Sequence, residues 1–286
     1  MAGGAAVAAA GLGTVAATTA SASPDGSTSA SPSASASSPS KEVCYKLTSE
    51  TTEGPYYIDA DKIRKNITEG KAGIPMTLRL KLIDSETCKP LAKAAVDIWH
   101  CDALGLYSGY EDSSSGGGTP PTGAPPTGTP TDTPTGAPTG APPGGGHQDP
   151  TDDKRYLRGT QLTDRHGFVE FTTVFPGWYR GRCVHIHTKV HVGGKMTDSG
   201  YEGGHACHTG QLFFDEESVL ASAEVAPYST STTPRTTLDE DTIYPGNGAE
   251  GGLLKLQYRK GKIAKGVVGS LTLGVDPDAT NDGTGM

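Results

Sequence analysis

Short stretches in which hydrophobic and polar residues alternate recur along the chain. The clearest covers Thr77–Ile83, where Leu78, Leu80 and Leu82 would share one face of a strand, because successive side chains of a strand point to opposite faces. Alternation or short runs rich in β-branched and aromatic residues predict further strands over Ala95–His100, Phe168–Val174, His185–Val192, Gln211–Phe214, Leu253–Tyr258 and Val267–Leu273. Helical periodicity is confined to Glu216–Glu224, which predicts a helix of about two turns.

Short strands joined by Gly- and Pro-rich connections are typical of an all-β protein. Because each predicted strand has one apolar face to bury, two sheets must pack together. The pattern therefore predicts a β-sandwich of about seven to eight strands with long loops.

Four segments lack the composition of a folded core. Residues 1–22 are small and apolar, contain no Lys or Arg, and end in Ala20-Ser21-Ala22, a pattern similar to the apolar part and cleavage site of an export signal. They predict a secreted protein, although a plain Ala-rich tail has the same composition. Gly, Thr and Ala dilute this run, so we expect no membrane span.

Residues 23–40 are mostly Ser, Pro and Ala and predict a linker. Residues 113–146 contain Gly, Pro, Thr, Ser and Ala with Asp132 as their one charged residue, and predict a disordered insertion. Residues 276–286 are expected to form a flexible tail. The remaining part, residues 41–275 without the insertion, is long enough for one domain with its own core.

Charge and cysteine content exclude some classes of site. The net charge of −8 argues against a nucleic-acid surface. No two cysteines form a CxxC pair, which argues against a structural zinc site. In an oxidising compartment we expect two disulfides and one remaining thiol, with the pairing left open, among Cys44, Cys88, Cys101, Cys183 and Cys207.

The run PGWYRGRCVHIH, from Pro176 to His187, carries the strongest chemical signal. His185 and His187 alternate along a predicted strand, so they share a face and could bind one metal ion. Tyr179 could add a phenolate, a donor that favours a hard ion such as Fe(III) over zinc. The plain alternative is a surface strand with two histidines and a structural tyrosine.

A second run, WHCDALGLYSGY, follows the predicted strand that ends near Trp99 and presents Tyr107 in a Gly-containing loop. Tyr107 and Tyr179 with His185 and His187 would make two phenolates and two imidazoles. A tyrosine stays protonated up to a pH of about 10 in water, but a bound trivalent cation would remove that proton.

These residues resemble the intradiol ring-cleavage dioxygenases, non-haem Fe(III) enzymes that open catechols between their two hydroxyls, and most of all the extracellular branch of that family. The motifs that carry the resemblance are TEGPYY from Thr52, DIWHCDALGLYSGY from Asp97, LRGTQLTDRHG from Leu157, PGWYRGRCVHIH from Pro176 and HTGQLFF from His208. They extend from Thr52 to Phe214, and the family's β-sandwich agrees with the predicted fold.

The resemblance implies a role for each matching residue. Tyr107, Tyr179, His185 and His187 match the four ligands of Fe(III). Arg182 matches the arginine that faces the substrate, and Gln211 matches a glutamine behind the ligands. Tyr179, on the turn before the histidines, would also leave the metal and take up a catechol proton.

Several other aromatic and histidine residues have plainer interpretations. Trp99 and Phe213 are expected in the core, and Tyr56 and Tyr57 are expected to pack rather than act. His205 and His208 are expected in a loop, away from a ligand set that is already complete, and His191 lies further along the strand of His185.

The resemblance also implies the reaction. A catechol-type substrate and O2 would give a cis,cis-muconic acid, and the family predicts a homodimer. The insertion at 113–146 could lie at the pocket mouth or in solvent, and the short link from Tyr179 to His185 predicts an open pocket.

Two other functions remain as alternatives. The first is an exported, non-enzymatic β-sandwich binding module with a relict metal site, which would be expected to have lost at least one ligand. The second is a hydrolytic or copper enzyme that uses the histidine pair, but the sequence places no carboxylate or third histidine as clearly as the two tyrosines.

Overall fold

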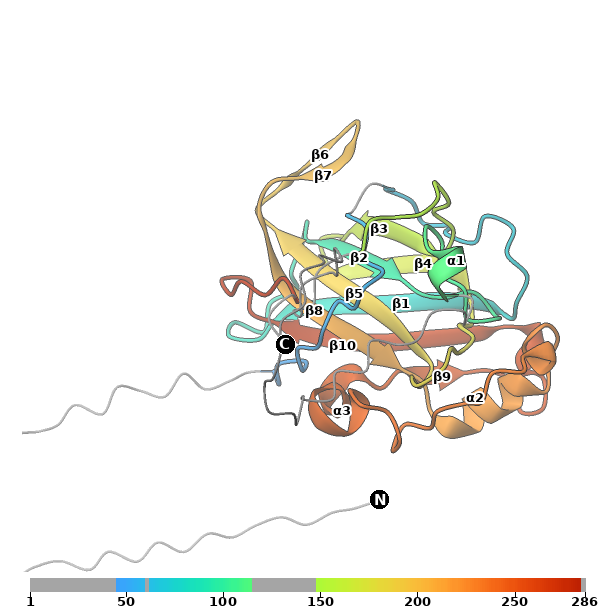
Figure 1. The fold of residues 1–286 in the computed structure, drawn as a ribbon. Coiled ribbons are helices and arrows are strands. Elements are labelled where there is room, and N and C mark those ends of the chain that lie inside the picture. Colours follow the sequence, from blue (N-terminus) through green and yellow to red (C-terminus); the bar gives the residue numbers. More distant parts are fainter. Residues whose placement is uncertain (1–44, 60–61, 115–147, 284–286) are drawn as a thin grey trace, which may run out of the picture. The chain divides into compact units, whose positions relative to one another are not determined.

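The computed structural model describes residues 45–59, 62–114 and 148–283 (Figure 1). The expected export segment 1–22, the linker 23–40 and residues 115–146 of the predicted insertion lie outside this part of the chain. The strands are β1 Pro75–Asp84, β2 Ala95–Trp99, β3 Arg158–Leu162, β4 Phe168–Val174, β5 His185–Val192, β6 Lys195–Thr197, β7 Gly200–Glu202, β8 His205–Phe213, β9 Lys255–Gln257 and β10 Val267–Val275. The α-helices are α1 Glu111–Ser114, α2 Glu216–Ala223 and α3 Ala249–Gly252, with 3-10 turns at Tyr228–Thr230 and Ile263–Lys265 and a π-turn at Tyr244–Gly248.

Two four-stranded sheets form the body of the protein, which confirms the predicted all-β sandwich. One sheet has the order β4-β1-β10-β9 and the other has the order β3-β2-β5-β8. The β1–β10 pair is parallel and the other pairs are antiparallel. One core cluster contains buried residues of both sheets, such as Leu80 and Phe171 from the first and Ile98, Ile186 and Leu212 from the second. The sheets therefore bury their apolar faces against each other.

The described elements agree with most of the predicted strands and add others. Leu78, Leu80 and Leu82 of β1 are fully buried, as their alternation predicts. Helix α2 is present, and the carboxylate of Asp215 caps it by accepting from the backbone N–H of Ser218 at 2.8 Å. Strand β3 and the β6–β7 hairpin were not predicted, since neither has an alternating apolar pattern.

Strand β8 begins at His205, six residues before the predicted start at Gln211. The expectation that His205 and His208 lie in a loop is therefore wrong. The first half of β8 is polar yet mostly buried, because polar groups of other segments face it. The Glu50 carboxylate, for example, accepts from the Thr209 N–H at 2.8 Å. Hydrophobic patterning does not detect a strand of this kind.

The expectation of two disulfides is also wrong. Cys101, Cys183 and Cys207 are buried free thiols, and Cys88 is disulfide-bonded. Three free thiols among five cysteines leave at most one disulfide. Burial raises the pKa of all three free thiols, which keeps them protonated and unreactive.

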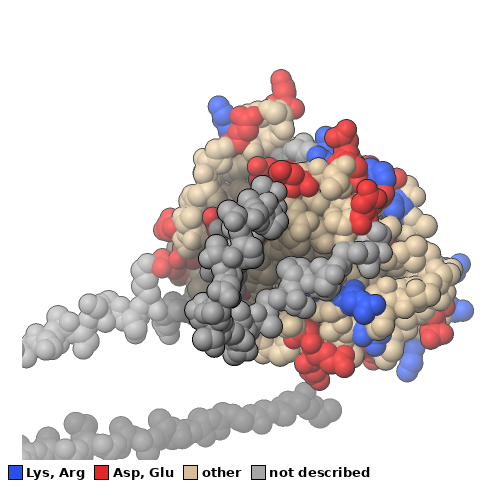
Figure 2. All heavy atoms as spheres, in the orientation of Figure 1, with Lys and Arg blue, Asp and Glu red and all other residues tan. Residues whose placement is uncertain are grey.

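The surface and the ends of the described chain add three observations. Acidic and basic side chains are interspersed on the face shown in Figure 2. The β6–β7 hairpin projects away from the two sheets (Figure 1). After β10 the chain returns to β8, where the Asn281 N–H donates to Ala206 O at 2.9 Å. Among the described residues, no helix is both long enough and apolar enough to cross a membrane.

His100 joins the two sheets through a buried polar contact. It follows β2, and its Nε2 lies 2.7 Å from Thr173 Oγ1 on β4 of the opposite sheet. Its Nδ1 lies 2.7 Å from the carbonyl oxygen of Cys101, an acceptor, so Nδ1 carries the proton of the neutral ring. Burial lowers the pKa of His100 to about 4.

This pKa predicts a loss of stability in mild acid. The folded pKa lies below the unfolded value of 6.5, so the stabilisation is fully present above pH 6.5 and disappears as the pH falls through about 4. We expect it to amount to about 3 kcal/mol of the free energy of unfolding. Urea unfolding of the wild type and of His100→Gln at several pH values should show a difference in stability that shrinks towards pH 4. A difference that stays constant would show that His100 does not charge on unfolding.

Candidate metal centre

Strand β5 places His185 and His187 side by side in the interior. They are 2% and 3% exposed, and their Nε2 atoms lie 3.1 Å apart. His185 Nδ1 lies 2.7 Å from the carbonyl oxygen of Cys183, so its proton is on Nδ1 and the lone pair of its Nε2 is free. Two nitrogens about 2.1 Å from one metal ion, in neighbouring coordination positions, are about 3 Å apart. The spacing of the pair therefore fits two ligands of a single ion.

Tyr107 and Tyr179 bring two phenols to the same place from two different loops. The Tyr107 ring lies 5.7 Å from the Tyr179 ring and 6.2 Å from the His187 ring, centroid to centroid. The Oη of Tyr179 is 3.4 Å from His185 Nε2. The Oη of Tyr107 is buried and has no hydrogen-bond partner. A buried polar atom without a partner is costly, and a cation between these rings would satisfy it.

Close packing of the two loops sets the position of both tyrosines. The Asp102 carboxylate accepts from the backbone N–H groups of Leu104 and Leu106 at 2.9 and 3.0 Å, which forms the turn before Tyr107. Gly105 in that turn has a φ of +89°, and a Cβ at this position would lie 2.4 Å from Trp178 O. Only glycine allows this approach, which brings the turn against the residue that precedes Tyr179.

Aromatic rings pack around the pair of histidines and around Tyr107. Trp99 is fully buried, as predicted, and stacks on His187 with ring centroids 4.9 Å apart and an interplanar angle of 7°. Tyr57 packs against Trp99 at 4.7 Å, and Tyr56 packs against Tyr107 at 4.9 Å. Tyr56 and Tyr57 thus pack as expected, but they do so in the immediate surroundings of the candidate ligands.

The four candidate ligands carry no net charge in this environment. Burial raises the pKa of Tyr107 well above its usual value and raises that of Tyr179 to about 12, although the charge of Arg182 opposes both effects. Burial also lowers the pKa of His185 to about 3 and that of His187 well below its usual value. A set of two phenols and two neutral imidazoles has lone pairs but no charge, and a bound cation would ionise the phenols.

Other metal-binding arrangements are missing from the described part of the chain. No three side chains of the His, Cys, Asp or Glu type gather there around a common point. His208 Nδ1 lies 2.7 Å from Glu50 Oε1, and His205 Nε2 lies 3.1 Å from Pro277 O, so both histidines have other partners. The mixed tyrosine and histidine set is therefore the metal candidate within the described residues.

Arg182 and Gln211 stand next to this set, and a third residue, Asp241, holds Arg182. The guanidinium of Arg182 donates from Nη2 to Gln211 Oε1 at 2.5 Å, and Gln211 Nε2 donates to Thr52 O at 3.0 Å. On its other side, Arg182 Nε donates to Asp241 Oδ1 at 2.8 Å. The side chain of Asp241 is fully buried. It also accepts from the backbone N–H groups of Cys183, Ile243 and Tyr244.

Asp241 is the residue of this network that the sequence did not indicate. It lies in the run TTLDEDTIYPG, where three acidic residues stand close together and none has a distinctive spacing. Burial alone would raise the pKa of Asp241, but the hydrogen bond and the charge of Arg182 outweigh it and lower the pKa to about 2. Asp241 is therefore ionised at neutral pH and fixes the direction of the guanidinium.

A buried ion pair holds the TEGPYY segment against the candidate metal centre. Lys189, on the same face of β5 as His185 and His187, donates to the carboxylate of Glu53, and both side chains are at most 5% exposed. Gly54 follows directly, with a φ of +71°, and a Cβ there would lie 3.2 Å from His187 Cε1. The pair thus holds the backbone of this segment against the His187 ring.

Solved structures resemble this chain over most of its length. An intradiol ring-cleavage dioxygenase from Tetranychus urticae is 30% identical, with 83% of this chain and 98% of the other covered and a TM-score of 0.65. A second dioxygenase of known crystal structure is 32% identical, with 83% and 97% covered and a TM-score of 0.64. No family model matches the sequence, and no curated protein matches it.

The role of Asp241 can be tested through stability. Asp241→Asn leaves the guanidinium of Arg182 without its counter-charge and should lower the free energy of unfolding by about 3 kcal/mol. In an Arg182→Met background the same change should cost at least about 1 kcal/mol less. The exposed neighbour Asp239 provides the control, because Asp239→Asn should change stability by at most about 0.5 kcal/mol. Equal costs in both backgrounds would mean that Asp241 does not act on Arg182.

Proposed function

This chain belongs to the intradiol ring-cleavage dioxygenases, enzymes that open catechol-type rings, and on that premise we propose that it is an Fe(III) enzyme whose metal is held by Tyr107, Tyr179, His185 and His187. The observation that supports this proposal most is the convergence of these four rings around the unpartnered Oη of Tyr107. When bound there, ferric iron supplies the Lewis acidity that makes a coordinated catechol reactive towards O2.

Tyr179 is the residue that we assign to proton transfer. It is partly exposed, whereas Tyr107 is 1% exposed and enclosed by aromatic rings. Once a bound cation has ionised the phenols, the more exposed Tyr179 Oη could take up a proton from a catechol hydroxyl as the substrate binds, while Tyr107 stays in place.

Arg182 and Gln211 are assigned to the substrate ring. The guanidinium is held between Asp241 and Gln211, so its direction is set before the substrate arrives. A fixed positive charge beside the ring stabilises negative charge that develops on a ring carbon during attack by O2. Cleavage of the bond between the two hydroxyl-bearing carbons, with one oxygen atom of O2 added to each, would give a cis,cis-muconic acid.

We also propose that the protein acts outside the cell. The export-like composition of residues 1–22 supports this location, and the disulfide bond of Cys88 is a modification of oxidising compartments. Catechols released from plant phenolics would be suitable substrates there. Membership of the family also predicts a homodimer. Light scattering of the purified protein would measure its oligomeric state directly.

The ligand assignment predicts the metal content of single variants. His185→Ala removes one nitrogen of the pair and should lower the iron content of the purified protein, measured by mass spectrometry, by at least about tenfold. Tyr107→Phe keeps the ring but loses the Oη, and should lose ring-cleavage activity. His166→Ala, at an exposed histidine in the turn before β4, is the matched control and should keep both. Full iron content and activity in His185→Ala would exclude His185 as a ligand.

A further inference from the structure

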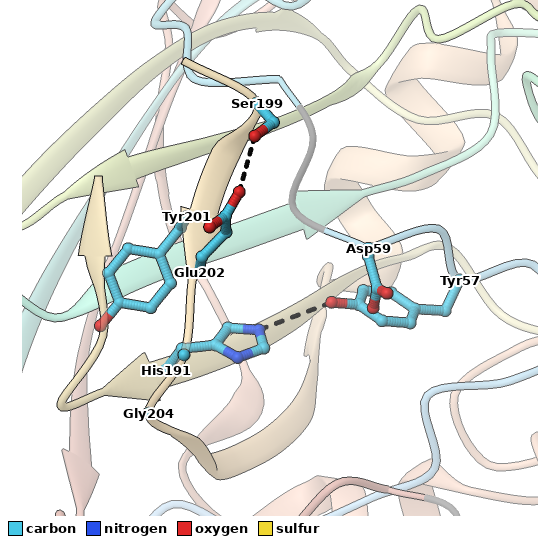
Figure 3. Close-up of a pocket in the computed structure, with 8 residues that line it drawn as sticks. Tyr57, Asp59, His191, Ser199, Tyr201, Glu202 and Gly204 are labelled. Atoms are coloured by element: carbon cyan, nitrogen blue, oxygen red, sulfur yellow. Dashed lines mark hydrogen bonds between the residues drawn. The ribbon is translucent and has the colours of Figure 1, made fainter. Parts of the chain in front are cut away.

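A cavity lies beside the candidate metal centre and is lined by none of the proposed ligands. It has a volume of about 400 Å³, a size common for small-molecule sites. Figure 3 shows its walls, which come from the end of TEGPYY and the residues after it, the end of β5, and the β6–β7 hairpin with the two glycines that follow it. The lining residues are Tyr57, Asp59, His191, Ser199, Tyr201, Glu202, Gly203 and Gly204.

Three aromatic side chains give the cavity an apolar wall with electron-rich faces. The rings of His191 and Tyr201 are 6.1 Å apart, and Tyr57 Oη lies 3.5 Å from His191 Nε2 (Figure 3). Burial lowers the pKa of His191 to about 4, so this imidazole is uncharged at neutral pH. One face of the Tyr57 ring already has a cation, the Lys189 ammonium, 4.0 Å from its centroid.

The two charged residues that line the cavity, Asp59 and Glu202, are both acidic. Asp59 lies beside Tyr57 and Glu202 lies on the hairpin (Figure 3), and no Lys or Arg is among the described residues that line the cavity. Glu202 is held by hydroxyl groups, with Ser199 Oγ donating at 2.6 Å and Thr197 Oγ1 at 2.9 Å, which lowers its pKa. These partners are neutral, so they fix the carboxylate without cancelling its charge. Lys189, the nearest cation along β5, is ion-paired with Glu53.

We propose that this cavity binds an organic cation, namely a protonated primary amine attached to a small aromatic ring. The two carboxylates would attract the ammonium group, and the partly exposed ring of Tyr201 would stabilise both the cation and the ring of the ligand. An anionic ligand would face two like charges, and a neutral one would lose the electrostatic contribution. The site is separate from the catechol site, and its existence does not depend on the identity of the metal.

Because the cavity lies close to Trp99, binding of a ligand there can be followed by tryptophan fluorescence. Tyr57 forms one wall and packs on Trp99, whose ring stacks on His187. A ligand against Tyr57 is therefore one ring away from Trp99. The chain has two tryptophans, and Trp178 lies on the loop before Tyr179, where its Nε1 donates to Thr233 O. A change in fluorescence that Trp99→Phe removes would report the cavity rather than the rest of the protein.

The test uses the full chain and three probes of the same size: benzylamine, benzyl alcohol and benzoate. Titration calorimetry at neutral pH should give saturable binding of benzylamine with a Kd below about 1 mM. Benzyl alcohol and benzoate should bind at least tenfold more weakly. Saturation with catechol under anaerobic conditions should leave the Kd of benzylamine unchanged, because the two sites are distinct.

Two charge-matched variants separate a built site from general attraction to an acidic protein. Asp59→Asn/Glu202→Gln should weaken benzylamine binding at least tenfold without changing the melting temperature, because both residues are exposed. Glu217→Gln/Asp278→Asn removes the same charge at two exposed positions outside the cavity and should leave the Kd unchanged. Equal weakening in both variants, equal binding of benzyl alcohol, competition by catechol or no saturation up to about 10 mM would each overturn the proposal.

Discussion

The whole centre depends on the direction of two side chains on β5. Because a strand repeats every two residues, His185 and His187 must point to the same face, and hydrogen bonding to Cys183 O leaves the His185 Nε2 lone pair free. That face is covered by the turn with Tyr107, the loop with Tyr179 and the segment with Gly54. A shift of β5 by one residue would move both imidazoles to the other face of the sheet. The pairing of β5 with β2 and β8 on its two sides holds this register.

The second constraint concerns charge: the buried candidate ligands are uncharged and need no counter-charge. Two phenols and two imidazoles can be enclosed by aromatic rings at a lower cost than charged groups because all four are neutral there. The charged residues near them are paired instead: Arg182 with Asp241, and Lys189 with Glu53. The protein thus keeps a polar but uncharged cluster ready for a cation, and it keeps one guanidinium in a fixed direction beside it. This division suits the proposed function, in which the centre would accept a metal and then a substrate with developing negative charge.

Sequence reasoning succeeded where the signal was local. The alternation in β1 and the spacing of His185 and His187 follow from strand geometry, and the fold class followed from the short strands. The links between distant segments were not accessible in this way. Asp241 reaches Arg182 across 59 positions, and Glu53 reaches Lys189 across 136, so no periodicity connects them. Strand β8 was placed too late because its buried side chains are polar, and their partners are found only in the folded protein. The cavity beside Tyr57 has the same origin, since its walls come from three separate segments.

The visible absorption spectrum of the purified, iron-loaded protein tests the central claim most directly. If Tyr107 and Tyr179 bind ferric iron, the protein should be red-brown, with a broad phenolate-to-iron charge-transfer band that shifts when catechol is added without oxygen. A protein that binds iron but stays colourless, with no change on addition of catechol, would contradict tyrosine ligation at this centre.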